Sequence, residues 1–233
     1  MKLIVSNRAS EKFFSLLENM KIDYIKSKDN ISFNKNYFDH PDISLFYFEK
    51  TLYVENSVFS YYKNKLKNIN IESVNSNFLK NKEVCLNIAF NNRFFFHNEK
   101  FTPTDIFKKL SKNKEYIKIN QGYANCSMIC FQNHIITSDV GIYKTLLKKN
   151  INVKIVTTDG ILLNGYKNGF IGGSCGFISK DKLLFYGDVT KYKDYDIIKE
   201  IADIENVELI FPKNTDFVDL GGIISLIWNY NYN

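Results

Sequence analysis

The feature that most constrains the fold of this chain is a repeated strand–strand–helix–strand pattern. Each repeat has two short extended segments joined by a turn, then a segment with helical periodicity, then a third extended segment. The repeats begin at Ile43, Val84, Ser127 and Ser174, at intervals of 41, 43 and 47 residues. Such spacing is typical of a protein that uses one supersecondary unit several times.

The elements of the four repeats can be placed by residue range. The expected first strands are ISLFYF (43–48), VCLNIAF (84–90), SMICF (127–131) and SCGFIS (174–179). The expected second and third strands are TLYV (51–54), NIESV (70–74), RFFFH (93–97), YIKI (116–119), HIIT (134–137), VKIV (153–156), KLLFYG (182–187) and VELIF (207–211). Ser, Asp and Pro are common at helix starts, so helices are expected from Ser57, after Pro103, from Asp139 and near Asp194.

The two chain ends supply the parts of a fifth unit. GGIISLIW (221–228) is a lone first strand, while KLIV (2–5), a helix containing Phe13 and Leu17, and IDYI (22–25) supply the rest. An open stack would leave both half-units unpaired. We therefore expect a single domain over residues 1–233, an α/β-propeller whose five units form a closed ring. The alternative, a doubly wound sheet, has one strand per helix rather than three.

Charge and hydropathy restrict the partners and the location. The formal net charge is +6, and the excess Lys residues lie in KNKLKN (63–68), KKLSKNK (108–114) and KK (148–149). These segments indicate either solvated helix faces or a nucleic-acid surface. The longest apolar runs are far shorter than the roughly 20 residues of a membrane span, and the N-terminus does not resemble a signal peptide. We expect a soluble, cytoplasmic protein with reduced thiols and no membrane partner.

The Cys126–Cys130 pair does not predict a disulfide or a metal site. Residues four apart in a strand lie about 13 Å from each other, whereas a disulfide requires Cα atoms within roughly 7 Å. No second cluster of metal ligands accompanies the pair, so no metal is expected. Cys130 and Cys85 are expected in the core.

Cys126 lies at the start of an expected strand, four residues after Gly122. It is either a small buried thiol or a nucleophile, and a nucleophile would need a cationic neighbour such as His40 to lower its pKa. Cys175 in GGSCG is the competing thiol, or a spacer where backbones crowd. His97 and His134 are expected at the surface.

The motif HPD (40–42) predicts a stiff lead-in to a strand, because Pro41 fixes its own φ and restricts His40. His40 is either a turn residue or a general acid–base, and Asp42 either bonds nearby backbone or binds a guanidinium or amine. Asn87 is either a satisfied core amide or a ligand group.

Two further motifs have structural interpretations. Asp139 in TSDVG is expected to be a helix N-cap. The glycine-rich GFIGGSCGF (169–177) lacks the Lys-Ser/Thr of a P-loop and leads into a strand, so no nucleotide site is expected there. Its glycines would instead let the chain pass close to a channel or a ligand.

The repeat and five motifs together resemble the pentein, or guanidino-modifying enzyme, family over the whole chain. The motifs are HPD (40–42), QGYANCS (121–127), ITSD (136–139), GFIGGSCG (169–176) and DLGG (219–222). Members include dimethylarginine dimethylaminohydrolase, amidinotransferases and the ribosome anti-association factor, and this sequence looks similar to an uncharacterised bacterial branch. The resemblance implies a central channel lined by the first strands, and enzymes with a Cys nucleophile, a His from a His-x-Asp-type motif and an acidic partner. It implies no cofactor.

The chain departs from the family pattern at its C-terminus. The family's Cys lies close to that end, where GGIISLIWNYNYN contains none. Counted around the ring, however, Cys126 lies two units after His40, and Asp219 lies one unit before it. The resemblance thus implies catalytic roles for Cys126, His40 and Asp219. Residues near the starts of first strands are implied to bind substrate, namely Asp42, Asn87, Gln121, Ser127, Gly173 and Ser174.

Three functions remain open from the sequence. The first is a Cys/His-dependent hydrolase or transferase acting on a guanidine- or amidine-type small molecule. The second is a ring without catalytic activity that binds a small ligand. The third is a ring that binds the ribosome or RNA, as the anti-association factor of this family does.

Overall fold

The structure is a computed structural model, and it describes residues 2–76 and 81–226. Within these residues the strands form five three-stranded sheets, ordered β15-β1-β2, β3-β4-β5, β6-β7-β8, β11-β10-β9 and β12-β13-β14. The strands are β1 (Lys2–Val5), β2 (Asp23–Lys26), β3 (Leu45–Phe48), β4 (Thr51–Glu55), β5 (Asn70–Val74), β6 (Ala89–Phe90), β7 (Phe94–His97), β8 (Glu115–Lys118), β9 (Met128–Cys130), β10 (Ile135–Thr137), β11 (Val153–Ile155), β12 (Cys175–Ser179), β13 (Lys182–Phe185), β14 (Glu208–Ile210) and β15 (Ile224–Ser225).

Each sheet repeats one pairing pattern. The central strand pairs antiparallel with the first strand of its unit and parallel with the third, and a helix makes the parallel connection. The α-helices are α1 (Glu11–Asn19), α2 (Pro41–Ser44), α3 (Phe59–Lys65), α4 (Thr104–Asn113), α5 (Val140–Lys148) and α6 (Tyr195–Ile204), and the 3-10 turns are η1 (Asn56–Val58), η2 (Lys82–Val84), η3 (Gly172–Ser174) and η4 (Val189–Lys191). The five strand–strand–helix–strand units expected from the sequence are confirmed.

The chain ends meet in one sheet, as expected. Strand β1 pairs antiparallel with β15, with Ile4 opposite Ile224 and Leu3 opposite Ser225. Ile227 and Trp228, also expected in this last strand, lie outside the described residues.

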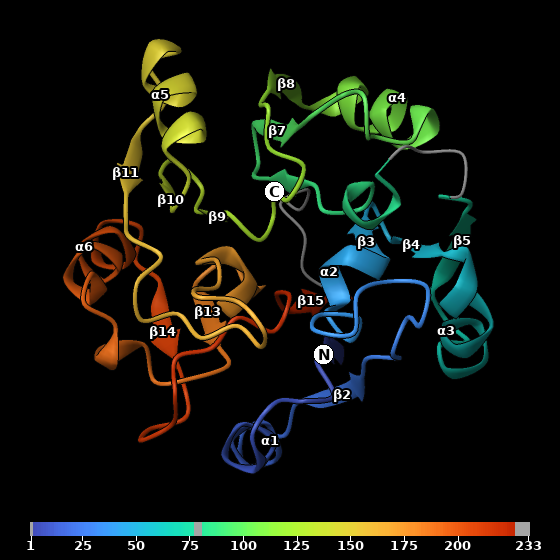
Figure 1. Ribbon diagram of the computed structural model, residues 1–233, viewed down its shortest axis with the longest axis horizontal. Helices are drawn as coiled ribbons and strands as arrows, with labels where there is room; N and C mark the ends of the chain where they lie inside the picture. Colours follow the sequence, from blue (N-terminus) through green and yellow to red (C-terminus); the bar gives the residue numbers. More distant parts are fainter. Residues whose placement is uncertain (1, 77–80, 227–233) are drawn as a thin grey trace.

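Helices α4, α5 and α6 start where the sequence indicates, directly after Pro103, Asp139 and Asp194. The helix expected from Ser57 starts later: Ser57 lies in the 3-10 turn η1, and α3 begins at Phe59. Ser10 caps α1 by accepting a hydrogen bond from Phe13 N, and Asp139 caps α5 by accepting one from Ile142 N at 2.7 Å. Figure 1 shows α1, α3, α4, α5 and α6 on the outside of the molecule, with the sheets between them.

Two expected first strands are shorter than their apolar patterns. In ISLFYF the strand begins only at Leu45, because Pro41 opens the one-turn helix α2. Pro is favoured at the first position of a helix, where its missing N–H costs nothing. The expected direct lead-in from HPD to a strand is therefore wrong, although His40 has the extended backbone (φ −61°, ψ 122°) expected before Pro.

The second short strand is that of VCLNIAF, where only Ala89 and Phe90 form β6. Val84 ends the 3-10 turn η2, and Asn87 lies between that turn and the strand. A helical turn thus precedes β3, β6 and β12 alike. Because of these helical turns, the polar residues come before each of these first strands in the sequence and not within the strands.

The apolar interior is divided into five clusters, each of which joins two sheets. Representative members of three clusters are Ile4 of β1 and Leu52 of β4, Phe48 of β3 and Phe95 of β7, and Phe96 of β7 and Ile135 of β10. A fourth cluster joins Ile136 of β10 to Phe185 of β13, and a fifth joins Leu184 of β13 to Leu3 of β1. Every sheet therefore shares a cluster with two others.

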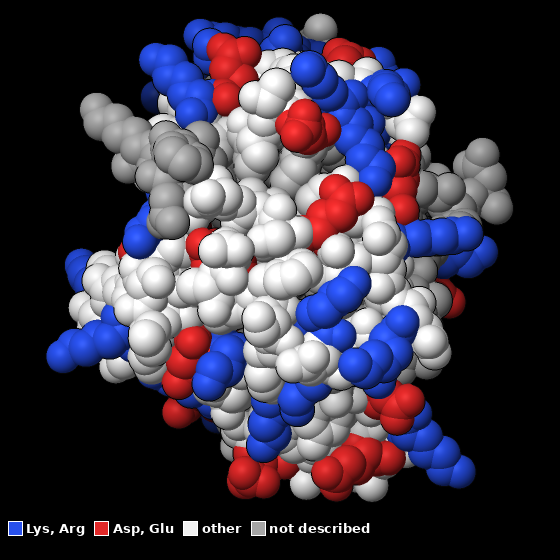
Figure 2. All heavy atoms as spheres, turned by 90° about the vertical axis from the view of Figure 1, so that its right-hand side faces the viewer, with Lys and Arg blue, Asp and Glu red and all other residues white. Residues whose placement is uncertain are grey.

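The described surface is charged and of mixed sign. On the face shown in Figure 2, Lys and Arg side chains are spread among Asp and Glu side chains. No helix within the described ranges is long and apolar enough to cross a membrane.

Candidate active site

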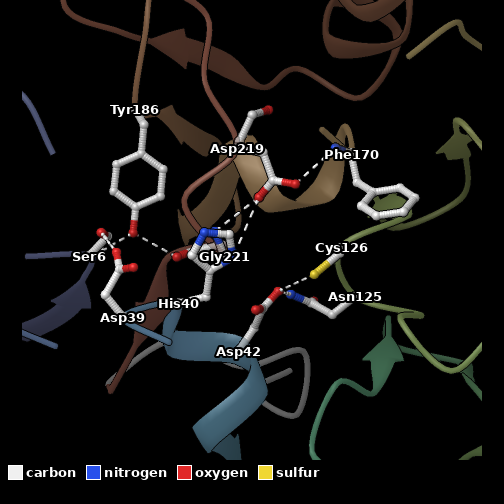
Figure 3. A network of polar contacts seen from close by, with 12 residues as sticks. Ser6, Asp39, His40, Asp42, Asn125, Cys126, Phe170, Tyr186, Asp219 and Gly221 are labelled. Carbon is white, nitrogen blue, oxygen red and sulfur yellow. Dashed lines mark hydrogen bonds and ion pairs between the residues drawn. The ribbon is translucent and has the colours of Figure 1, made fainter. Parts of the chain in front are cut away.

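Four side chains that the sequence analysis singled out lie close together in the segments that precede β3, β9 and β15. His40 and Asp42 come from the start of α2, Cys126 from the loop before β9, and Asp219 from the loop before β15. All four are 2–5% exposed. Figure 3 shows Cys126 and Asp42 pointing toward one another, with His40 beside Asp219 and Gly221. The sequence-derived set of Cys126, His40 and Asp219 thus occupies one buried region.

The thiol of Cys126 is held by two polar side chains. Its Sγ donates to Asp42 Oδ2 at 3.0 Å and accepts from Asn87 Nδ2 at 3.1 Å. Asn87 also accepts from the Cys126 backbone N–H through Oδ1 at 3.1 Å. Asn125 Nδ2 donates to the same Asp42 oxygen at 3.0 Å. Asn87 is therefore both a satisfied amide and a direct neighbour of the thiol.

His40 and Asp219 form the second half of the site. His40 Nδ1 lies 3.9 Å from Asp219 Oδ1, and the backbone N–H groups of Phe170 and Gly221 donate to Asp219 at 2.8 and 3.1 Å. Because His40 makes no N-cap bond to α2, its ring is available to Asp219. Among the described residues no hydrogen bond joins the His40 ring to the Cys126 thiol.

Backbone contacts connect the two halves. Asp42 N donates to Gly221 O at 3.1 Å, so the DLGG segment contacts the start of α2 as well as Asp219. Gly172 N and Gly173 N both donate to Cys126 O, at 2.7 and 3.1 Å. The glycine-rich segment before β12 therefore lies against the backbone of the thiol.

These glycines are required by close approach. A Cβ at Gly173 would lie 2.0 Å from Asp219 Oδ1, and one at Gly221 would lie 2.1 Å from His40 Cβ. Gly221 also has a φ of +80°, which L side chains rarely adopt. The glycine motifs thus let two backbone segments pack directly against His40 and Asp219.

Burial sets the protonation states. It raises the pKa of Cys126 well above 9, with Asp42 and Asp219 adding repulsion. His40 is not among the groups that shift the pKa of Cys126, so it does not supply the cationic neighbour that a nucleophilic thiol would need. Burial, aided by Arg8, lowers the pKa of His40 to about 3, and burial raises that of Asp219 to about 7. At neutral pH the site holds a thiol, a neutral imidazole and a partly protonated Asp219.

The other expected binding residues divide into two groups. Gly173 lies at the site, in contact with Asp219. Gln121 instead accepts from Gly122 N and Tyr123 N and donates to Asp139 at 3.3 Å. Ser174 Oγ donates to Ile171 O at 2.6 Å, and Ser127 Oγ is buried without a hydrogen-bond partner among the described residues. Among the described residues, no hydrogen bond joins any of these three side chains to the Cys126 thiol, whose partners are Asn87 and Asp42.

The remaining thiols and histidines are structural. Cys85 and Cys130 are buried, as expected, and Cys175 is buried with its Sγ 3.7 Å from Ile171 O. The surface position expected for His97 is wrong, because the ring is 0% exposed and bonds to Thr102 Oγ1 and to the carbonyls of Val84 and Gly122. His134 is half-buried and lies 2.7 Å from Glu205 Oε1.

Three aromatic residues lie beside the site, and the sequence patterns did not predict them there. The ring of Tyr37 lies 6.0 Å from that of His40, and its OH donates to Glu83 Oε2 at 2.8 Å. Tyr123 lies 6.5 Å from Tyr37 and stacks on Phe170 at 6.4 Å. These residues lie outside periodic segments, so hydrophobic patterns carry no signal for them. Asn125 was also missed, although it lies inside the QGYANCS motif.

A cavity of about 130 Å³ adjoins the site. Residues of β3, β6, β9, β12 and β15 line it, together with Asp42 and Asn125. Within the described ranges, no group of three or more His, Cys, Asp or Glu side chains could hold a metal ion.

Solved structures share this arrangement of sheets. The chain is similar to a variant of dimethylarginine dimethylaminohydrolase from Pseudomonas aeruginosa complexed with citrulline (8% identity, TM-score 0.55, covering 91% of this chain and 92% of that one). It is also similar to an amidinotransferase of saxitoxin biosynthesis from Microseira wollei (9%, 0.57, 93% and 88%) and to the agmatine deiminase of C. jejuni (12%, 0.53, 92% and 90%).

These similarities define the class: the protein has the pentein fold of the guanidino-modifying enzymes. At such identities the likeness establishes the fold alone. The chain belongs to the family of unknown function DUF6873, whose family model matches residues 4–224. No functionally curated protein matches the sequence.

Proposed function

We propose that this protein is a Cys/His-dependent hydrolase or transferase that acts on a small guanidine or amidine. The observation that carries the proposal is the pair of buried carboxylates, Asp42 and Asp219, which lie beside a thiol and an imidazole. Among the described residues neither carboxylate pairs with Lys or Arg. A planar cation with several N–H groups would satisfy both acids.

We infer that the five units form the closed α/β-propeller expected from the sequence. The five apolar clusters support this, because together they connect every sheet to two neighbours. The cavity supports it as well, since its lining comes from the first strand of all five units. The site then lies at one end of a central channel.

A cationic substrate would supply the activation that the unliganded site lacks. The pKa of Cys126 is raised by burial and by two carboxylates. A guanidinium bound to Asp42 and Asp219 would cancel their repulsion and place a positive charge beside the sulfur. Both effects favour the thiolate. Cys126 is thus a nucleophile that the substrate itself activates.

The proposed reaction has two steps. Cys126 Sγ attacks the central guanidine carbon while its proton passes to Asp42. The C–N bond then breaks, and the leaving amine takes a proton from the His40–Asp219 pair. In the second step water, or an acceptor amine in a transferase, attacks the same carbon and returns a proton to the His40–Asp219 pair. The C–S bond then breaks, the sulfur recovers its proton from Asp42, and the remaining excess proton leaves to solvent with the products. With water the product is a urea derivative.

The experiment is an assay of arginine, agmatine and dimethylarginine for release of ammonia or amine and formation of a ureido product. We expect turnover of at least one of them by the wild-type protein, loss of that turnover in Cys126→Ala, and retention in Cys85→Ala, where the substituted thiol lies outside the site. Mass spectrometry of the quenched reaction would show a covalent adduct on Cys126. Equal turnover in both variants would refute the nucleophilic role.

A second candidate is a non-catalytic ring that binds a small cation. The raised pKa of Cys126 and the absence of a thiol–imidazole hydrogen bond in the described residues favour it. Cation binding without any adduct on Cys126 would distinguish it from the enzyme. Ribosome or RNA binding remains the third proposal, and the mixed charges in Figure 2 lend it no support.

A further inference from the structure

We propose that the ligand of this site carries an apolar group, no larger than about a phenyl ring, that occupies the 130 Å³ cavity while its N–H groups bond to Asp42. The ligand class is therefore an aryl- or alkyl-substituted guanidine or amidine, not a zwitterionic amino acid held in this cavity. The orientation of the ligand toward Cys126 rests on the proposed function, whereas its binding in the cavity does not.

The walls of the cavity are apolar and come from all five sheets. Phe46, Phe90, Ile129, Phe177 and Ile224 each contribute from a different first strand. An engineered cavity of about 150 Å³ with similar walls in another protein stays dry and binds benzene. A volume of 130 Å³ therefore suits a small hydrocarbon group better than it suits a group that must stay hydrated.

One residue of the cavity lining has an unsatisfied carboxylate oxygen. Asp42 lines the cavity and is 3% exposed. Its Oδ2 accepts from Cys126 and Asn125, but its Oδ1 has no hydrogen-bond partner among the described residues. Buried acceptors without partners are uncommon and require an explanation. An N–H group of a bound ligand would donate the hydrogen bond that Asp42 Oδ1 lacks, while the apolar part of the same ligand fills the cavity.

The lining of the cavity has a rim of half-buried residues. Phe90, Phe177 and Ile224 are half-buried, whereas Asp42 and Cys175 are buried. A ligand that enters from this rim would place its apolar part among the aromatic side chains and its polar head at the carboxylate.

The lining also excludes one kind of ligand. No Lys, Arg or His belongs to it. The carboxylate of an amino acid would therefore be buried in a mostly apolar cavity without a cationic side chain to pair with, which is costly.

The test is calorimetric titration of the full chain with phenylguanidine, guanidinium ion and arginine. We expect phenylguanidine to bind at least tenfold more tightly than either of the others. Asp42→Asn should weaken its binding at least tenfold. Asp39→Asn is the matched control, because Asp39 is equally buried but bonds to Ser6 and Arg8 and does not line the cavity.

Two cavity-filling variants test the apolar part. Cys130→Leu fills the cavity from β9, and Ile224→Trp fills it from the half-buried rim, where a larger side chain is tolerated if Cys130→Leu does not fold. Each should abolish the preference for phenylguanidine over guanidinium, while Leu162→Trp, at a position 51% exposed and outside the cavity, should keep it. Equal affinity for the three ligands, or an unchanged preference in folded Ile224→Trp, would overturn the proposal.

The same variants separate this proposal from the proposed function. Tight, cavity-dependent binding of phenylguanidine without turnover of any guanidine would support the cavity and reject the enzyme. Turnover of arginine without a preference for apolar guanidines would support the enzyme and reject the cavity.

Discussion

Cys126 Sγ lies 3.0 Å from Asp42 Oδ2, although 84 positions separate the two residues in the chain. The contact joins the loop before β9 to the start of α2, and hence the third unit to the first. An acidic side chain at this distance stabilises the protonated thiol. Without a ligand, the Cys126 thiol therefore resists ionisation. Its ionisation depends on a ligand or a substitution that neutralises the charge of Asp42.

The first prediction concerns Asp42→Asn. Loss of this carboxylate should lower the pKa of Cys126, because Asp42 raises it by both repulsion and hydrogen bonding. Each unit of that decrease raises the thiolate fraction about tenfold at a given pH. The pH dependence of alkylation by a small electrophile, with Cys126 followed by peptide mass spectrometry, measures the change. Asp39→Asn should leave the profile unchanged, and equal acceleration in both variants would contradict the prediction.

The second prediction concerns the opposing pH dependences of His40 and Asp219. The pKa of Asp219 is raised to about 7 in the folded chain, from an ordinary 3.8. Its contribution to stability is complete below pH 3.8 and is lost as the pH rises to 7. The pKa of His40 is lowered from 6.5 to about 3. Its contribution is complete above pH 6.5 and is lost as the pH falls to 3. Between pH 4 and 6.5 the two slopes, each up to about 1.4 kcal/mol per pH unit, oppose one another.

Single substitutions should expose each slope. Relative to the wild-type protein, the unfolding free energy of Asp219→Asn should rise with pH between 4 and 7, whereas that of His40→Asn should fall between 4 and 6.5. Urea denaturation at a series of pH values measures both. If the two variants show slopes of the same sign, the assigned protonation states are wrong.

The fold was predictable because its information is local and repeated. Alternation in TLYV and NIESV, a Ser at a helix start and a recurring interval each depend on a few neighbouring residues, and four copies reinforced one another. The same local rules failed just before the first strands. There the apolar runs around Ile43 and Leu86 continue through helical turns, and periodicity does not separate a buried turn from a buried strand.

The site was only partly predictable, since its contacts are distant in sequence. The order of Asp219, His40 and Cys126 around the units predicted that these three residues lie in one region, and the structure places them there. It did not show that Asp42 holds the thiol while His40 lies beside Asp219. Nor did it show the sign of the Cys126 pKa change, which depends on the burial of two carboxylates.

The third prediction concerns Gly173→Ala. The added Cβ would lie 2.0 Å from Asp219 Oδ1, the oxygen nearest His40 Nδ1, so the Asp219 carboxylate must leave its present position. Overpacking of this kind costs about 1–3 kcal/mol of unfolding free energy, and binding of a guanidinium ligand should weaken as well. Gly160→Ala is the control, because Gly160 has a φ of +87° but nothing within 4 Å of its Cβ. It should cost about 1 kcal/mol through backbone strain and leave ligand binding intact. Unchanged binding in Gly173→Ala would show that Asp219 is not needed in its present position.

The last prediction concerns Tyr186, which connects both chain ends to the fourth unit. Its OH accepts from Ser6 N at 2.9 Å, just after β1, and donates to Gly222 O at 2.7 Å, just before β15. Tyr186→Phe would leave both backbone groups buried without this partner, so the unfolding free energy should fall by about 1–3 kcal/mol. Tyr24→Phe is the matched control. Within residues 2–76 and 81–226 the Tyr24 OH has only an exposed contact of 3.5 Å with Glu18, so the change should cost less than about 0.5 kcal/mol. Hydrogen exchange should also speed up at Leu3 and Ile4 of β1 in Tyr186→Phe, because the pairing of β1 with β15 loses its support. Equal stability of the two variants would mean that the pairing of the chain ends does not depend on Tyr186.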